Sequence, residues 1–416
     1  MEEKKITTAV LVGMAENAAA VPMQQSSLDE LERLLETAGG EAFAKVLQIK
    51  SSYDARTCIG SGKVREIAEL CHVNGISLVI FDFELTAGQI RNLEEDMGDI
   101  RVIDRSMLIL DIFALHATSG EGKLQVELAQ LKYTAPRLMG QGKELSRQGG
   151  GIGSRGPGES KLESDRRHLK ERIHALEAQL AEMEHTRGVM RRQRDKSGLK
   201  KIAIVGYTNA GKSTLLNALT DAGVLSEDKL FATLDPTTRR LELPCGESVL
   251  LTDTVGFIRR LPHHLVEAFR STLDEVRYAD ILMIVADVSD PELSEELAVT
   301  EEIITSLDAK DKPRIYVYNK CDTVEGFLCA DVREDAVAIS AKEGKGLELL
   351  LSKIEDVLHK QSKDYDLLFP YDAQARLNDL YRDYTVLSTE YGDNGTRVRA
   401  RLDEKGKGMF AKYILE

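Results

Sequence analysis

The amino-acid sequence predicts a multidomain α/β protein with a doubly wound, mostly parallel central sheet. A chain of 416 residues has room for two or three domains. Short apolar runs alternate with helical periodicity over residues 5–105 and again over 200–360, a pattern typical of parallel sheets covered by helices. Leucines at heptad spacing occupy the region between these stretches. We therefore expect the segments 1–105, 106–197, 198–362 and 363–416 to be structurally distinct.

The first segment, 1–105, is predicted to be a small α/β domain. Strands are expected at 6–12, 77–82 and 100–103, because these runs are apolar and bounded by polar residues. Ser27 and Glu30 have the spacing of a capping box, so we expect a helix to begin there and to stop at Gly39. Further helices are expected around 64–71 and 85–97.

The second segment, 106–197, is predicted to be a helical hairpin. Apolar residues recur at intervals of three and four on both sides of a glycine-rich loop, 143–158; examples are Leu124, Leu128 and Leu131 before it and Leu169, Leu176 and Leu180 after it. Two helices joined by such a loop are expected to pack antiparallel. The alternative is that both are solvated helices packed on a neighbouring domain.

The last two segments again mix helices and strands. Strands are expected at 202–205, 248–252, 281–286, 315–318 and 336–339, with helices between most of them, which predicts a doubly wound domain over 198–362. Segment 363–416 is predicted to be a small α/β domain, with a helix around 373–384 and a hairpin that turns at 392–395.

Composition limits the function. The net charge of −14 argues against a protein that coats nucleic acid over its whole surface. There is no apolar run of the roughly 20 residues that a membrane span needs, and the N-terminus does not resemble a secretory signal. Five cysteines without a CxxC pair predict neither a disulfide framework nor a zinc site. We expect a cytoplasmic monomer, with a membrane-associated fraction as a secondary expectation.

The strongest motif is a phosphate-binding loop. The pattern GxxxxGK[ST] follows a strand and opens a helix, the context that supports its assignment. Its glycines let backbone N–H groups converge on a phosphate, to which the helix N-terminus adds positive charge. We expect Lys212 to reach the β- and γ-phosphates and Ser213 to bind Mg²⁺. The predicted loop comprises Gly206, Tyr207, Thr208, Asn209, Ala210, Gly211, Lys212, Ser213 and Thr214.

Two further motifs follow later strands in the expected order. The run Asp253, Thr254, Val255 and Gly256 places a carboxylate near Mg²⁺ and a backbone N–H near the γ-phosphate. The run Asn319, Lys320, Cys321 and Asp322 ends in a carboxylate that can accept hydrogen bonds from both N1–H and the N2 amino group of guanine, which adenine lacks. Ser340, Ala341 and Lys342 come after the next strand and are expected to pack on the base.

Together these motifs resemble the small GTPase superfamily of the translation-factor-like class, which implies binding of GTP and GDP with Mg²⁺. In that superfamily the first switch lies between the first helix and the following strand, here at Phe231, Ala232, Thr233, Leu234 and Asp235. The switch threonine closes on Mg²⁺ when the γ-phosphate is present. Thr233, Thr237 and Thr238 are all candidates for it.

Position 257 carries a phenylalanine where many GTPases place the glutamine that orients water. We therefore expect slow intrinsic hydrolysis, with the missing group supplied from elsewhere. Asn209 lies where several such GTPases bind K⁺, so K⁺ stimulation is a hypothesis that equal rates in KCl and NaCl would refute. Arg259 and Arg260 are interpreted as an exposed partner surface, with action in cis as the alternative, and His263 and His264 as surface residues.

The glycine-rich loop lies in a basic region. Residues 132–201 hold 17 Lys and Arg against 9 Asp and Glu, a balance of +8 that leaves −22 for the rest of the chain. No strand precedes the formal dinucleotide pattern at Gly151, Gly153 and Gly156, so we reject that reading. Gly60–Lys63 is likewise only half a phosphate loop. Arginines such as Arg155 beside flexible glycines favour contact with RNA over a merely solvated helix.

Long runs of this sequence resemble the HflX family of GTPases. They are RTCIGSGK at 56–63, ELAQLKYTAPR at 127–137, GGGIGSRGPGESKLESDRR at 149–167 and FATLDPTTRR at 231–240. The resemblance favours Thr233 as the switch threonine. The sequence departs from the family pattern at Ser160 and Lys161, where Thr and Gln are expected. The resemblance implies binding to the large ribosomal subunit, hydrolysis stimulated by that subunit, and splitting or rescue of stalled ribosomes, with loop 143–158 reaching ribosomal RNA.

Three other functions remain as alternatives. A regulatory GTPase with a protein partner would not co-sediment with large subunits. An ATP-using RNA remodeller driven by the N-terminal domain would keep its ATP turnover when Asp322 is replaced. A large-subunit assembly GTPase needs the same RNA contact and nucleotide switch as a splitting factor, so the sequence does not separate the two.

Overall fold

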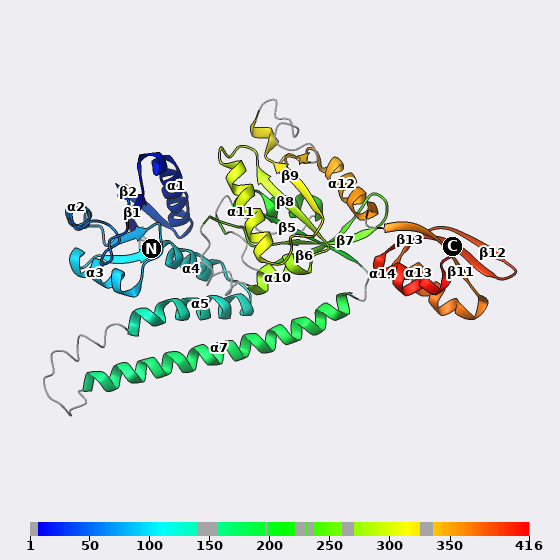
Figure 1. Cartoon of the computed structure of the whole chain (residues 1–416), viewed down its shortest axis with the longest axis horizontal. Helices are drawn as coiled ribbons and strands as arrows, with labels where there is room; N and C mark the ends of the chain where they lie inside the picture. The colour runs from blue at the N-terminus through cyan, green and yellow to red at the C-terminus, as the bar shows by residue number, and fades with distance from the viewer. Residues whose placement is uncertain are drawn as a thin grey trace, which may run out of the picture. The chain divides into compact units, whose positions relative to one another are not determined.

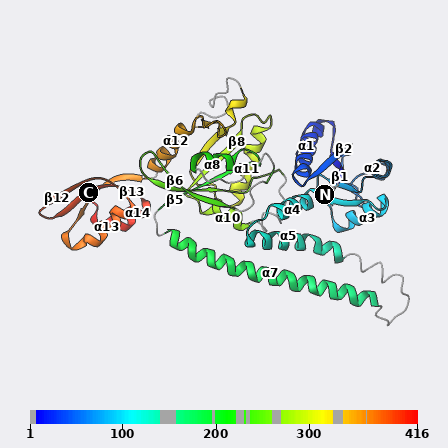
Figure 2. The same cartoon turned by 180° about the vertical axis from the view of Figure 1, so that it is seen from behind.

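The computed structural model describes residues 7–139, 157–195, 199–220, 230–231, 236–259, 270–324, 336–360 and 362–415. The chain divides into two compact units. One comprises residues 1–184, 227–235 and 260–271, and the other comprises 185–226, 236–259 and 272–416. Both contain sheets flanked by helices (Figures 1 and 2), which confirms the predicted multidomain α/β class.

The first unit is built on a four-stranded sheet, with strand order β2-β1-β3-β4 and every pairing parallel. Its strands are β1 (Thr7–Ala15), β2 (Gly40–Ile49), β3 (Leu78–Phe81) and β4 (Arg101–Asp104). Its helices are α1 (Val21–Thr37), α2 (Ser61–Asn74), α3 (Ala87–Met97) and α4 (Arg105–His116). Apolar residues of β1, β3 and β4 form a core with those of α2 and α3.

Two details of this unit differ from the sequence expectations. The sequence did not predict β2, an edge strand whose residues are mostly half-buried or exposed. The first helix begins at Val21, with proline at its start, and not at Ser27. The capping-box prediction was therefore wrong. Ser27 lies buried within α1, and its hydroxyl donates to Asp82 at 2.6 Å instead of capping the helix.

A buried ionic network joins α1, the end of β3 and α4. The Arg105 guanidinium is almost fully buried and pairs with Glu30 and, at 2.8 Å, with Asp82. Asp82 also accepts hydrogen bonds from Gln24 and Ser27, each at 2.6 Å. Three charges removed from water are tolerated only when they are paired in this way.

We expect Arg105→Leu to destabilise the protein by about 3–5 kcal/mol, because the change removes the positive charge that compensates two buried carboxylates. Urea unfolding of the full chain measures this loss. Arg56→Leu is the matched control: Arg56 pairs with Glu95 and Asp96 at the surface, so its loss should cost about 1 kcal/mol or less. Equal stabilities for the two variants would contradict the prediction.

Helices α5 (Gly120–Met139) and α7 (Pro157–Asp195) lie side by side (Figures 1 and 2). Arg172 of α7 makes two hydrogen bonds to the Glu127 carboxylate, at 2.7 and 2.8 Å, and Lys132 pairs with Glu177 at 2.8 Å. Leu176 is fully buried. The two predicted helices are therefore present, whereas residues 143–156 of the glycine-rich loop lie outside the described residues and 157–158 begin α7.

The second unit contains a six-stranded sheet of order β10-β9-β8-β5-β7-β6, parallel except for β6. Its strands are β5 (Lys200–Gly206), β6 (Thr237–Glu242), β7 (Ser248–Asp253), β8 (Ile281–Asp287), β9 (Arg314–Asn319) and β10 (Val337–Ala338). Its helices are α8 (Lys212–Thr220), α10 (Arg270–Tyr278), α11 (Leu293–Ser306) and α12 (Leu347–Lys360). Apolar residues of the sheet, α8 and α12 form its core.

The same unit ends in a three-stranded antiparallel sheet of order β11-β13-β12. Its elements are β11 (Ser362–Phe369), α13 (Gln374–Asp383), β12 (Thr385–Gly392), β13 (Gly395–Asp403) and α14 (Glu404–Phe410). The predicted helix and hairpin are both present, and β11 is an additional strand. Among the residues that the structure describes, no helix combines the length and hydropathy needed to cross a membrane.

Candidate nucleotide-binding site

The predicted motifs converge at one edge of the six-stranded sheet. The phosphate loop follows β5, Asp253 is the last residue of β7, and Asn319 is the last residue of β9. These strands are parallel to one another or to β8 between them, so their carboxyl ends meet at the same edge. In open α/β sheets this edge is where ligands bind. The topology thus brings together motifs that are far apart in the sequence.

Three glycines are required by close backbone approaches around the loop. A Cβ at Gly206, where φ is +148°, would lie 2.1 Å from the carbonyl oxygen of Val285. A Cβ at Gly211, where φ is +91°, would lie 2.2 Å from Nδ2 of Asn319. At Gly256 it would meet Thr208 at 2.8 Å. The loop therefore packs directly against its neighbours and tolerates no side chain at these positions.

Lys212 is the charged group at the centre of the loop. Its side chain is buried, and Nζ donates to the carbonyl oxygen of Tyr207 at 2.7 Å. Burial lowers the pKa of Lys212 to about 8, although the nearby Asp253 and Glu296 carboxylates oppose this. Lys212 is therefore mostly protonated at pH 7 and loses its proton as the pH rises through about 8.

This pKa predicts that nucleotide affinity falls as the pH rises through about 8. Phosphate oxygens favour the charged ammonium, so bound nucleotide raises the pKa of Lys212 and binding takes up a proton above pH 8. Between pH 7 and pH 8.5 the Kd for GDP should rise roughly fourfold. Isothermal titration calorimetry at the two pH values measures this Kd. Both values lie below the pH at which guanine itself ionises.

Lys212→Arg is the control for this titration, because a guanidinium stays charged throughout the range. For this variant, the Kd at pH 8.5 divided by the Kd at pH 7 should reflect only the ionisation of the nucleotide's phosphate groups. An identical pH ratio in both proteins would rule out Lys212 as the titrating group.

A hydroxyl and a carboxylate lie together where the loop meets β7. Ser213 Oγ donates to Asp253 Oδ2 at 2.6 Å, and Asp253 is fully buried. Thr254 is held nearby by a hydrogen bond from its hydroxyl to the Ile204 carbonyl at 2.7 Å. This pair of oxygen donors fits the preference of Mg²⁺ for oxygen ligands. Val255, the remaining member of this motif before Gly256, is buried.

The backbone of Phe257 pairs with the loop. Its N–H donates to the Gly206 carbonyl at 3.0 Å, and its carbonyl accepts from Thr208 N–H at 2.8 Å. The aromatic side chain is almost fully buried. It therefore offers no hydrogen bond to an attacking water, as the sequence suggested.

Arg259 does not form the exposed surface that the sequence predicted. Only 9% of it is exposed, and Nη2 pairs with Glu292 at 2.9 Å and with Glu295 at 3.0 Å. The Arg259 backbone N–H also donates to the Tyr207 hydroxyl at 2.8 Å. That expectation was wrong because the two glutamates of the α11 region neutralise the arginine. Arg260, His263 and His264 lie outside the described residues.

Asn319 connects the phosphate loop with the expected base site. Its Nδ2 donates to the Ala210 carbonyl at 2.9 Å, and its Oδ1 accepts from Ala341 N–H at 3.0 Å. Cys321 N–H donates to the Ile339 carbonyl at 3.1 Å, which fixes the following turn.

The expected base-recognition carboxylate lies exposed beyond that turn. A hydrogen bond from the buried Ser340 hydroxyl lowers the pKa of Asp322, so the carboxylate is ionised as guanine recognition requires. Lys320 adopts a left-handed backbone, with φ +64°, and pairs with Asp287 at 2.6 Å. Sequence reasoning missed Asp287, whose only signal is its position at the end of β8. Lys342 is exposed.

The first switch is described only in part. Phe231 is buried, with φ +58°, and its ring meets Phe113 of α4 edge-on at a centroid distance of 4.7 Å. Ala232, Thr233, Leu234 and Asp235 lie outside the described residues. Thr237 and Thr238 lie in β6, where the Thr238 hydroxyl contacts that of Thr252 at 2.9 Å. Asn209, with φ +61°, and Thr214 lie in the loop and the first turn of α8.

Family models match three consecutive stretches of the chain. A model described as "GTP-binding GTPase N-terminal" matches residues 25–114, and one described as "GTP-binding GTPase Middle Region" matches 116–194. A third, described as "50S ribosome-binding GTPase", matches 201–320. The motifs gathered at the sheet edge, from the phosphate loop to Lys320, fall in the third match.

Curated relatives match most of the chain. The "GTPase HflX" of Caldanaerobacter subterraneus subsp. tengcongensis is 49% identical over 394 residues, covering 95% of this chain and 91% of that protein. The "GTPase HflX" of Escherichia coli is 41% identical, covering 90% and 89%. A GTP-binding protein from Sulfolobus solfataricus, crystallised with GDP, is 27% identical over 85% of this chain and 99% of that one, with a TM-score of 0.45.

Proposed function

The chain belongs to the HflX family of GTPases and hydrolyses GTP; we propose that it does so on the large ribosomal subunit, where it splits or rescues stalled ribosomes. The observation that carries the GTPase assignment is the convergence of Lys212, Asp253 and Asn319 at one sheet edge. Two observations support the ribosomal role. One is the match to a 50S ribosome-binding model, and the other is the basic balance of residues 132–201.

The chain's own residues would share the work of binding GTP. The loop from Gly206 to Ser213 surrounds the phosphates, and Lys212 places its ammonium against the β- and γ-phosphates. Asp322 accepts the two guanine hydrogen bonds that select GTP over ATP. Asn319 holds these two regions in fixed register.

Mg²⁺ fits the oxygen donors at this site and would neutralise phosphate charge when bound. We propose that the Ser213 hydroxyl and Thr233 are its protein ligands, with Asp253 acting through a water. Asn209 is the residue that would hold K⁺. Equal GTPase rates in KCl and NaCl would refute the K⁺ hypothesis. They would not affect the proposal for Mg²⁺.

Hydrolysis by the isolated chain should be slow. Phe257 is buried and cannot orient water, and Arg259 is engaged by Glu292 and Glu295. We propose that the large subunit supplies or repositions the missing group. This explains why stimulation by a partner is expected from the chemistry as well as from the family.

The test compares the GTPase rate of the full chain with and without purified large subunits. We expect strong stimulation for the native chain. Arg155→Glu should weaken subunit binding about tenfold or more and reduce its salt dependence, without changing GDP affinity, because it removes a predicted phosphate contact. Arg155→Lys, which keeps the charge, should retain binding. If large subunits did not stimulate hydrolysis, the proposal that the protein acts on the large subunit would be contradicted. If Arg155→Glu bound subunits as the native chain does, the proposed RNA contact of the loop would be contradicted.

A further inference from the structure

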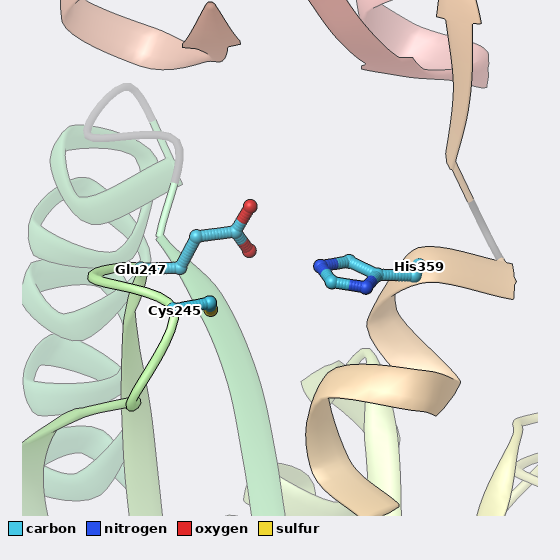
Figure 3. Close-up of side chains that lie close together, drawn as sticks. All are labelled: Cys245, Glu247 and His359. Carbon is cyan, nitrogen blue, oxygen red and sulfur yellow. The ribbon is translucent and has the colours of Figure 1, made fainter. Parts of the chain in front are cut away.

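A thiol, a carboxylate and an imidazole meet at the other end of the six-stranded sheet. Cys245 and Glu247 lie in the turn between β6 and β7, before the start of β7, whereas the nucleotide motifs follow its end. His359 lies in the last turn of α12. One potential ligand atom from each of the three lies within 4.8 Å of the other two. Figure 3 shows the imidazole directed toward the Glu247 carboxylate across from the turn.

The turn is fixed against α12 by backbone interactions. Gly246 adopts φ +86°, and its N–H donates to the Leu243 carbonyl at 2.8 Å, which closes the turn. The Cys245 N–H donates to Glu355 Oε1 at 2.8 Å. Glu355 and His359 are four residues apart on α12 and therefore share a face. The contact that anchors the turn thus also presents the cysteine to the histidine.

A third element orients the carboxylate. The Thr385 hydroxyl, at the start of β12, donates to Glu247 Oε1 at 2.6 Å. Carboxylates that bind metal ions are usually oriented by a hydrogen bond of this kind from a neighbouring group. The three donor groups are therefore held by the β6–β7 turn, α12 and the C-terminal sheet.

The donor types select the class of ion. Thiolate, imidazole and carboxylate are the ligands of Zn²⁺, whereas Mg²⁺ and Ca²⁺ prefer oxygen alone. We propose that Cys245, Glu247 and His359 form a zinc site, with Sγ, a carboxylate oxygen and an imidazole nitrogen as ligands and a fourth position open to water. On binding, the thiol proton is released to solvent and Sγ coordinates as the thiolate.

The electrostatics of the cluster favour a cation. Cys245 is exposed at the turn, and the Glu247 and Glu355 carboxylates both lie close to it. Two carboxylates beside a thiol leave an excess of negative charge that a divalent cation would neutralise. The sequence predicted no zinc site because His359 is remote from Cys245 and Glu247, and spacing rules detect only neighbouring ligands.

Zinc at this site would add a cross-link between elements that already share a hydrophobic core. It would tie the β6–β7 turn to the end of α12, just before β11, the first strand of the C-terminal sheet. The expected consequence is a higher melting temperature for the zinc-loaded chain, since a ligand that binds only the folded state stabilises it.

The experiment uses the purified full chain with Zn²⁺ and Co²⁺ as probes. We expect one zinc ion per chain after gel filtration, and a thiolate-to-cobalt charge-transfer band when Co²⁺ replaces it. Cys245→Ser should abolish the band, and His359→Gln should weaken zinc binding at least tenfold. Thr385→Val, which removes the support of Glu247, should weaken it about 10–100-fold.

His185→Gln is the matched control, because His185 is an exposed histidine outside the cluster, and it should bind zinc like the native chain. The GDP affinity of each variant shows whether that variant is folded. This affinity should be unchanged, because the nucleotide site lies at the opposite edge of the sheet. The proposal is overturned if the native chain gives no thiolate–cobalt band, or if Cys245→Ser and His359→Gln bind zinc as the native chain does.

Discussion

Replacing Lys212 with alanine is expected to abolish GTP hydrolysis. The buried ammonium is the charge at the centre of the phosphate loop, and a charged hydrogen bond to phosphate contributes about 1.5–3 kcal/mol. Removing a group that also stabilises charge in the transition state costs a further factor of about 10²–10³ in rate. The two losses multiply, so turnover should fall below detection. Single-turnover hydrolysis of GTP measures the effect.

The same loss is expected for Ser213→Ala, whose hydroxyl meets Asp253 at 2.6 Å and is the proposed Mg²⁺ ligand. Lys363→Ala serves as the control, because it removes an exposed lysine from β11 in the C-terminal sheet. It should hydrolyse GTP at the native rate. Native turnover by Lys212→Ala or Ser213→Ala would refute the assignment of the site.

Asp322→Asn should reverse the base preference of the site. Guanine offers two donors, at N1 and N2, and the Asp322 carboxylate can accept from both. An asparagine is neutral and presents its NH₂ donor to one of them, so both charged hydrogen bonds are lost. At about 1.5–3 kcal/mol each, this corresponds to roughly 10²–10⁴-fold weaker GTP binding. Xanthine has a carbonyl in place of the amino group, so xanthosine triphosphate should bind the variant better than GTP does. Competition against a fluorescent nucleotide gives both affinities.

Asp372→Asn is the matched control, because Asp372 is an exposed carboxylate in the C-terminal domain. It should keep the native preference for guanine. If Asp322→Asn kept native GTP affinity, guanine recognition would have to lie elsewhere. Retained ATP turnover in that variant would instead point to a second nucleotide site.

The motifs of the candidate nucleotide site could be located from the sequence because each of them is local. Each motif is a short contiguous run at a strand end, and a single topology places all the runs at one edge. The partners of these motifs could not be predicted in the same way. Arg259 is neutralised by Glu292 and Glu295, and Lys320 by Asp287, and these pairings depend on how α11 and β8 pack.

The fold was predictable to a similar degree. Fully buried strands such as β3 give continuous apolar runs, whereas the edge strand β2 buries few side chains and leaves a weak pattern. Ser27 illustrates the opposite error, because a capping-box spacing also arises when a serine faces a buried carboxylate. In this chain tertiary contact with Asp82 decides its role.

Asn319 has a consequence for how quickly nucleotide can be captured. Its amide is bonded at one end to the phosphate loop and at the other to Ala341 beside the base site. The protein itself therefore holds the phosphate loop and the turn at Ala341 in register, so the entropy of ordering these two segments is lost during folding and not on binding. We therefore expect a guanine nucleotide to meet phosphate-binding and base-binding groups that are already aligned with each other.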